Sequence, residues 1–86
     1  MPESLNEKER QVLDLLILQA GGVNRPVRFG ELRKKGFPER VADIYHAHTD
    51  YLDSLANRLL QILDRKGWIT VKDAVNTVLY FPRVSS

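Results

Sequence analysis

The chain has 86 residues, of which 43% are hydrophobic, and a formal net charge of +2. This length suffices for one hydrophobic core but not for two, so we expect a single domain over residues 1–86 with frayed ends at 1–4 and 84–86. No apolar run approaches the roughly 18–20 residues needed to span a bilayer, and the acidic first ten residues do not resemble a signal peptide. Without cysteine there is no disulfide or thiolate metal site, and we expect a cytoplasmic protein that needs no cofactor.

The first predicted element is a helix over residues 5–20. Ser4 and Glu7 have the spacing of a capping box, in which each side chain satisfies a free backbone N–H group of the other residue. Apolar residues follow at helical spacing, and Gly21 and Gly22 supply the positive φ angles that commonly end helices.

The middle of the chain predicts shorter elements. Pro26 favours extended backbone before it, and the alternation that follows predicts a short strand over 27–29. A short helix is expected over 30–35, ended by Gly36. Pro38 suits the first position of another helix, but the sequence leaves open whether the segment 37–49 is helical.

The strongest periodic pattern predicts a long helix over residues 50–66. Thr49 or Asp50 is the expected N-cap, and Gly67 the expected end. Alternating β-forming residues then predict strands over 68–72 and 77–81, joined by a four-residue loop over 73–76 whose turn residues are Asp73 and Asn76.

This order of elements resembles the winged helix-turn-helix superfamily. Residues 5–13 are similar to its opening helix, residues 27–32 to the first strand running into the second helix, and residues 59–69 to the end of the recognition helix and the glycine that leads into the wing. The resemblance implies an α+β fold with three main helices, a short first strand and a C-terminal β-hairpin wing. It also implies that the helix 50–66 lies in the major groove of DNA and that the wing contacts the backbone or the minor groove.

The polar face of the helix 50–66 carries side chains suited to reading bases. Arginine pairs with guanine, and asparagine or glutamine with adenine, through two hydrogen bonds each. A solvated helix face has the same kind of composition without any partner. The candidate base-contacting residues are Ser54, Asn57, Arg58, Gln61 and Arg65.

Positive charge is concentrated in residues 25–40, where six basic and two acidic residues give a local balance of +4. Clustered cations beside a recognition helix are typical of DNA-binding proteins, although a solvated helix end produces a similar cluster. With two cations of the hairpin region, the candidate backbone-contacting residues are Arg25, Arg28, Arg33, Lys34, Lys35, Arg40, Lys72 and Arg83.

Two observations oppose DNA binding. Asp50 and Asp53 place negative charge at the start of the long helix, where it stabilises the helix dipole but repels phosphates. The hairpin loop also carries no cation. Both features would suit a protein partner.

Other chemistry finds little support in the sequence. His46, His48 and Asp50 could supply zinc ligands, but the two histidines point to different faces if the segment is helical, and loop or helix-end histidines explain the segment better. No glycine-rich phosphate loop, nucleophile elbow or zinc-protease motif is present, so we expect no catalytic residues and no enzyme.

The leading hypothesis is a small transcriptional regulator that binds double-stranded DNA. A homodimer is a further hypothesis, because helix-turn-helix proteins commonly bind paired half-sites. The alternative is a winged-helix protein–protein interaction module in a replication or transcription complex. RNA binding ranks lower because the sequence has no series of aromatic residues for stacking on bases.

Overall fold

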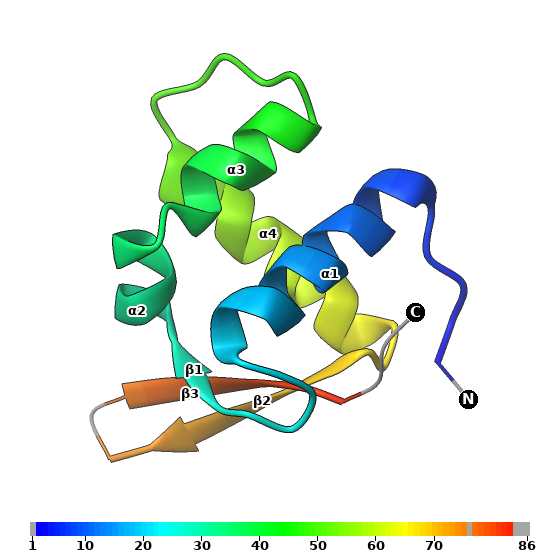
Figure 1. Cartoon of the computed structure of the whole chain (residues 1–86), viewed down its shortest axis with the longest axis vertical. Coiled ribbons are helices and arrows are strands. Elements are labelled where there is room, and N and C mark those ends of the chain that lie inside the picture. The colour runs from blue at the N-terminus through cyan, green and yellow to red at the C-terminus, as the bar shows by residue number, and fades with distance from the viewer. Residues whose placement is uncertain (1, 76, 84–86) are drawn as a thin grey trace.

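A computed structural model describes residues 2–75 and 77–83 of the chain (Figure 1). Over these residues the protein is a small α+β domain with four helices and a three-stranded antiparallel sheet. The elements are α1 (Glu7–Ala20), β1 (Val27–Arg28), α2 (Phe29–Lys34), α3 (Phe37–Ile44), α4 (Leu52–Arg65), β2 (Ile69–Ala74) and β3 (Thr77–Pro82). None of the described helices combines the length and the apolar character that crossing a bilayer requires.

Helix α1 begins two residues later than predicted, and Asn6 rather than Ser4 is its N-cap. The Asn6 side chain accepts a hydrogen bond from the Glu9 backbone at 2.8 Å, and the Glu9 carboxylate accepts one from the Asn6 backbone at 3.1 Å. The capping box is therefore real but displaced by two residues. Gly21, with a φ of 91°, ends the helix as the sequence predicts.

The expectation of three main helices is wrong, because residues 37–44 form a complete helix. α3 begins with Phe37 and Pro38 and buries Phe37, Val41 and Ala42. Proline is favoured in the first helical turn because its missing N–H would have no partner there. Burial of this apolar face, more than local propensity, stabilises so short a helix.

The boundaries around α2 and α4 also differ from the prediction. Phe29 opens α2 instead of ending the strand. α4 begins at Leu52, and its N-cap Tyr51 makes no side-chain capping bond. Thr49 accepts a hydrogen bond from the Tyr51 backbone at 2.9 Å, so it holds the preceding turn and does not cap the helix.

The sheet has the order β1-β3-β2, with β3 in the centre. Val27 pairs with Tyr80, and Tyr80 pairs with Val71. Pairing between β2 and β3 continues to Ala74 and Thr77, so the predicted four-residue loop is too long. Of the predicted turn residues, Asp73 lies in β2, while Asn76 and the expected frayed end 84–86 lie outside the described residues.

The core lies between the helices and one face of the sheet. α1 crosses in front of α4 above the hairpin (Figure 1), and the two helices contact each other. The largest fully buried side chains include Phe37, Leu13, Leu16, Leu32 and Leu60. Because one face of α4 is fixed against this core, its opposite face is presented to solvent.

Candidate nucleic-acid interface

The outward face of α4 carries four of the five predicted base-contacting residues. They recur at three- and four-residue steps and all four are exposed, and none of their side chains forms a hydrogen bond or ion pair with another described residue. Since they hold no internal partner, their donors and acceptors are available to a ligand. They are Ser54, Arg58, Gln61 and Arg65.

The fifth residue, Asn57, lies in an open groove of about 560 Å³ between α2, α4 and the hairpin. Arg28 and Lys34, both predicted to contact the DNA backbone, line the same groove. The fold therefore brings one amide and two cations together from three separate elements.

The groove also contains residues that the sequence did not single out. Thr77 and Tyr80 line it from β3, and Phe29 lines it from α2. Burial, with a smaller contribution from Asp73, raises the pKa of the Tyr80 hydroxyl above its ordinary value. Tyr80 therefore stays a neutral hydrogen-bond donor at physiological pH. The sequence placed Tyr80 in the predicted strand 77–81 but gave no sign of the groove.

Arg33 and Asp53 join α2 to the first turn of α4. An Arg33 guanidinium nitrogen lies 2.9 Å from a carboxylate oxygen of Asp53, and both side chains are about half exposed. The guanidinium carbon also lies 5.3 Å from the centre of the Phe29 ring. One of the two carboxylates that opposed DNA binding, Asp53, is thus paired, whereas Asp50 is exposed. The Arg33 head group is held by two contacts.

Three predicted backbone contacts lie elsewhere. Lys35 donates a hydrogen bond at 2.6 Å to the backbone oxygen of Gln19, near the end of α1. Arg40 lines a different groove, between α1 and α3. Arg25 lies in the loop between α1 and β1, where its backbone bonds to Gly22.

Lys72 and Arg83 belong to the outer face of the sheet. Arg28 pairs with Leu79, which pairs in turn with Lys72, so these three side chains form one row across the strands. Arg83 donates to the Thr70 hydroxyl at 2.9 Å, and Thr70 shares a face with Lys72 because they are two residues apart. The predicted cations therefore form a discontinuous set rather than one patch.

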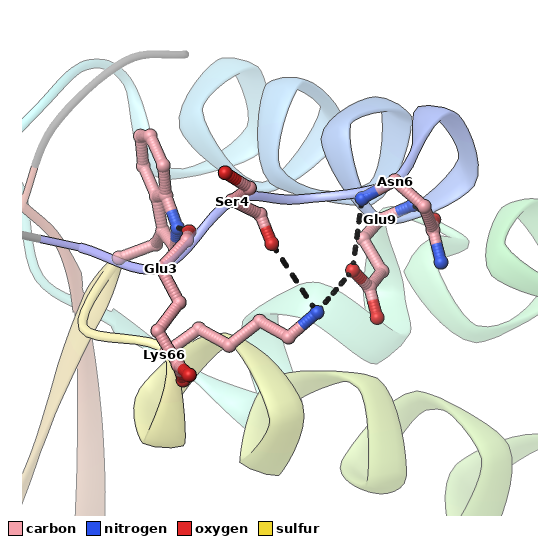
Figure 2. A network of polar contacts seen from close by, with 6 residues as sticks. Glu3, Ser4, Asn6, Glu9 and Lys66 are labelled. Atoms are coloured by element: carbon pink, nitrogen blue, oxygen red, sulfur yellow. Dashed lines mark hydrogen bonds and ion pairs between the residues drawn. The ribbon is translucent and has the colours of Figure 1, made fainter.

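A polar network fixes the far end of α4 against the N-terminal segment (Figure 2). The Lys66 ammonium lies 2.7 Å from the Glu9 carboxylate and 3.4 Å from the Ser4 carbonyl. The Glu3 backbone donates to the Lys66 carbonyl at 2.8 Å, and the Trp68 indole donates to the Glu3 carbonyl. No pattern in the sequence indicated this network, which joins the C-terminal end of α4 to the start of α1 and the segment before it.

Glu9 is the least exposed charged group of this network, with a side chain only 9% exposed. The hydrogen bond from Lys66 lowers the pKa of its carboxyl below the ordinary value, against the opposing effect of burial. The ion pair is therefore maintained at neutral pH.

Among the described residues, no three His, Cys, Asp or Glu side chains form a group that could hold a metal ion. His46, with a φ of 51°, and His48 lie in the connection between α3 and α4.

The chain matches no protein-family model, no curated protein and no solved structure.

Proposed function

We propose that this protein is a winged-helix domain that binds double-stranded DNA, with α4 as the helix that enters the major groove. The observation that carries the proposal is the outward face of α4, where four exposed polar side chains have no partner among the described residues. Side chains of these types form hydrogen bonds to the edges of base pairs.

The order of elements supports the winged-helix assignment. α1, β1 and α2 follow one another as in the opening of that fold, and α4 runs directly into the β2–β3 hairpin. The helix α3 lies between the second helix and the proposed recognition helix, and packs against α4.

The groove beside α4 supplies the second argument. Arg28 and Lys34 line it together with Asn57 and the acidic Glu31, so two cations and one carboxylate adjoin the proposed reading face and the balance is positive by one charge. Cations in this position would contact phosphates while α4 contacts bases. Pairing of Asp53 with Arg33 reduces the repulsion expected from the start of α4.

The test uses a labelled mixed-sequence duplex and a randomised duplex pool. Fluorescence anisotropy against salt concentration measures the electrostatic part of binding, and selection from the pool identifies a preferred sequence. The double variant Arg58→Ala/Gln61→Ala should lose about 1–3 kcal/mol for each base contact on the selected sequence. Lys34→Ala should instead weaken binding to all duplexes and reduce the salt slope by about one.

Arg10→Ala is the matched control, because it removes one exposed cation from α1, outside both the α4 face and the groove. It should bind like the unaltered protein. If no duplex binds in a salt-dependent manner at low ionic strength, the proposal is wrong.

The second candidate is a protein–protein interaction module, favoured by two exposed apolar side chains. Val75 at the hairpin tip is 90% exposed, and Tyr51 before α4 is 76% exposed. Tyrosine in particular is enriched at protein interfaces. A stoichiometric protein partner retained after nuclease treatment, together with absence of duplex binding, would select this function.

A further inference from the structure

Tyr51, the residue before α4, is the one aromatic side chain that the fold leaves in solvent. It is 76% exposed, whereas the other two tyrosines, the three phenylalanines and the tryptophan are buried or half-buried. A single exposed apolar side chain does not by itself indicate a ligand. The surroundings of Tyr51 therefore decide what its ring can do.

Tyr51 lines a hollow of about 340 Å³ at the N-terminal end of α4. The half-buried Leu55 and Ala47 give this hollow an apolar lining. The Thr49 hydroxyl accepts a hydrogen bond from the Tyr51 backbone at 2.9 Å, which holds the turn that carries the ring. The lining residues are Ala47, Thr49, Tyr51, Ser54, Leu55 and Arg58.

Arg58 supplies the only charge in this lining. Its side chain is exposed and forms no hydrogen bond or ion pair with another described residue. The two carboxylates near Tyr51 in the chain belong to other surfaces, since Asp53 is paired with Arg33 and Asp50 lines a neighbouring hollow on the α3 side. The hollow thus combines an aromatic ring and an apolar lining with a free guanidinium group.

We infer that this hollow binds a single nucleobase that has left the base stack, with Tyr51 stacking on the face of the base and Arg58 bonding to its edge. The inference rests on the proposed function, because Ser54 and Arg58 belong both to the outward face of α4 and to the hollow. Within a paired duplex each base is covered on both faces by its neighbours. The ring can therefore stack only on a base that is unpaired or extruded.

The composition of the hollow favours a base over a phosphate. A phosphate would gain from Arg58 but would lose hydration against Leu55 and the Tyr51 ring. A base has an apolar face for the ring and polar edges for the guanidinium group, and arginine pairs with the O6 and N7 atoms of guanine. We therefore expect an unpaired guanine to bind best.

Fluorescence anisotropy tests the stacking on an intact mixed-sequence duplex and on the same duplex with one unpaired guanine. The unaltered protein should bind the second duplex about tenfold more tightly, as expected for one base stacked on an aromatic ring. An unpaired base also makes a duplex easier to bend, so a variant must separate the two effects. Tyr51→Ala should bind both duplexes with similar affinity, whereas Tyr51→Phe should retain the preference.

Leu18→Ala is the matched control, because Leu18 is 71% exposed on α1 and lines neither this hollow nor the groove beside α4. It should show the same preference as the unaltered protein. The circular dichroism spectrum of Tyr51→Ala should be unchanged, because the ring is exposed.

Exchange of the unpaired guanine for thymine tests the role of Arg58. The unaltered protein should favour the guanine, and Arg58→Ala should bind the two duplexes alike. If no duplex binds in a salt-dependent manner, the proposed function fails together with the inference. If intact and bulged duplexes bind equally well, or Tyr51→Ala keeps the preference, the inference is wrong and the proposed function stands. A protein partner that Tyr51→Ala loses, without any preference for the unpaired base, would also overturn the inference.

Discussion

The two ends of α4 are attached to the rest of the molecule by ion pairs of the same chemistry and very different burial. At the C-terminal end, Lys66 meets Glu9 at 2.7 Å, and the two side chains are 28% and 9% exposed. At the N-terminal end, Arg33 meets Asp53 at 2.9 Å, and the two side chains are 59% and 49% exposed. Distance alone does not distinguish them.

Burial decides how much each ion pair contributes to the stability of the fold. A carboxylate removed from water must keep its partner, because an unpaired buried charge is strongly destabilising. An exposed pair gains little, since water and salt solvate either partner after separation. The C-terminal pair therefore stabilises the position of α4, while the N-terminal pair can be broken at little cost in stability.

The largest expected effect is that of Lys66→Met, which keeps an apolar stem but removes the ammonium from Glu9. We expect a loss of about 2–3 kcal/mol in the free energy of unfolding, measured by urea denaturation, because the carboxylate is left without its cation. The double variant Lys66→Met/Glu9→Gln should recover part of this loss. Equal stability of Lys66→Met and the unaltered protein would mean that the pair is not structural.

The second prediction concerns pH. The pKa of Glu9 is lower in the folded protein than its ordinary value of 4.5, so its contribution to stability is fully present above that value and is lost as the pH falls through the folded pKa. Unfolding free energies measured from neutral pH down to about pH 3 should therefore decline more steeply for the unaltered protein than for Glu9→Gln. Parallel curves would contradict the lowered pKa.

A smaller effect is expected for Asn6→Ala, which removes the capping side chain beside the same network. The Glu9 backbone N–H then loses its acceptor, and we expect a loss of about 1 kcal/mol in stability. Ser4→Ala is the matched control, because Ser4 takes part in the network only through its backbone carbonyl. A greater loss from Ser4→Ala than from Asn6→Ala would restore Ser4 as the cap.

The smallest expected effect on stability is that of Asp53→Asn. Because the pair with Arg33 is exposed, the unfolding free energy should change by less than about 0.5 kcal/mol. Under the proposed function, duplex affinity at low salt should rise, since a negative charge is removed and Arg33 is released. A stability loss as large as that of Lys66→Met would remove the distinction between the two ends of α4.

Some predictions from the sequence failed for identifiable physical reasons. Ser4 with Glu7, and Asn6 with Glu9, both have capping-box spacing, so spacing alone did not choose between them. The fold places Glu9 beside Lys66, 57 residues away, and the cap forms where that carboxylate is held. The sequence did not decide whether α3 forms, because its eight residues are stabilised by the burial of Phe37, Val41 and Ala42 against other elements.

The candidate site was predicted in composition but not in arrangement. The outward face of α4 followed from helical periodicity, because every third or fourth residue shares a side of the helix. The distribution of the cations did not follow, since residues that are clustered in sequence diverge once α2 and α3 turn away from each other. Arg33 thus reaches Asp53, Lys35 reaches the end of α1, and Arg40 faces the groove between α1 and α3.

The sequence by itself determined the two long helices, the hairpin and the α+β class. The signals for these elements are apolar periodicity, glycines that end helices and runs of β-forming residues, and each depends only on residues close together in the chain. Only the tertiary structure decided which charges are neutralised, which remain free, and which grooves the elements enclose. These outcomes depend on side chains such as Arg33 and Asp53, 20 residues apart, which meet only when the helices that carry them are packed.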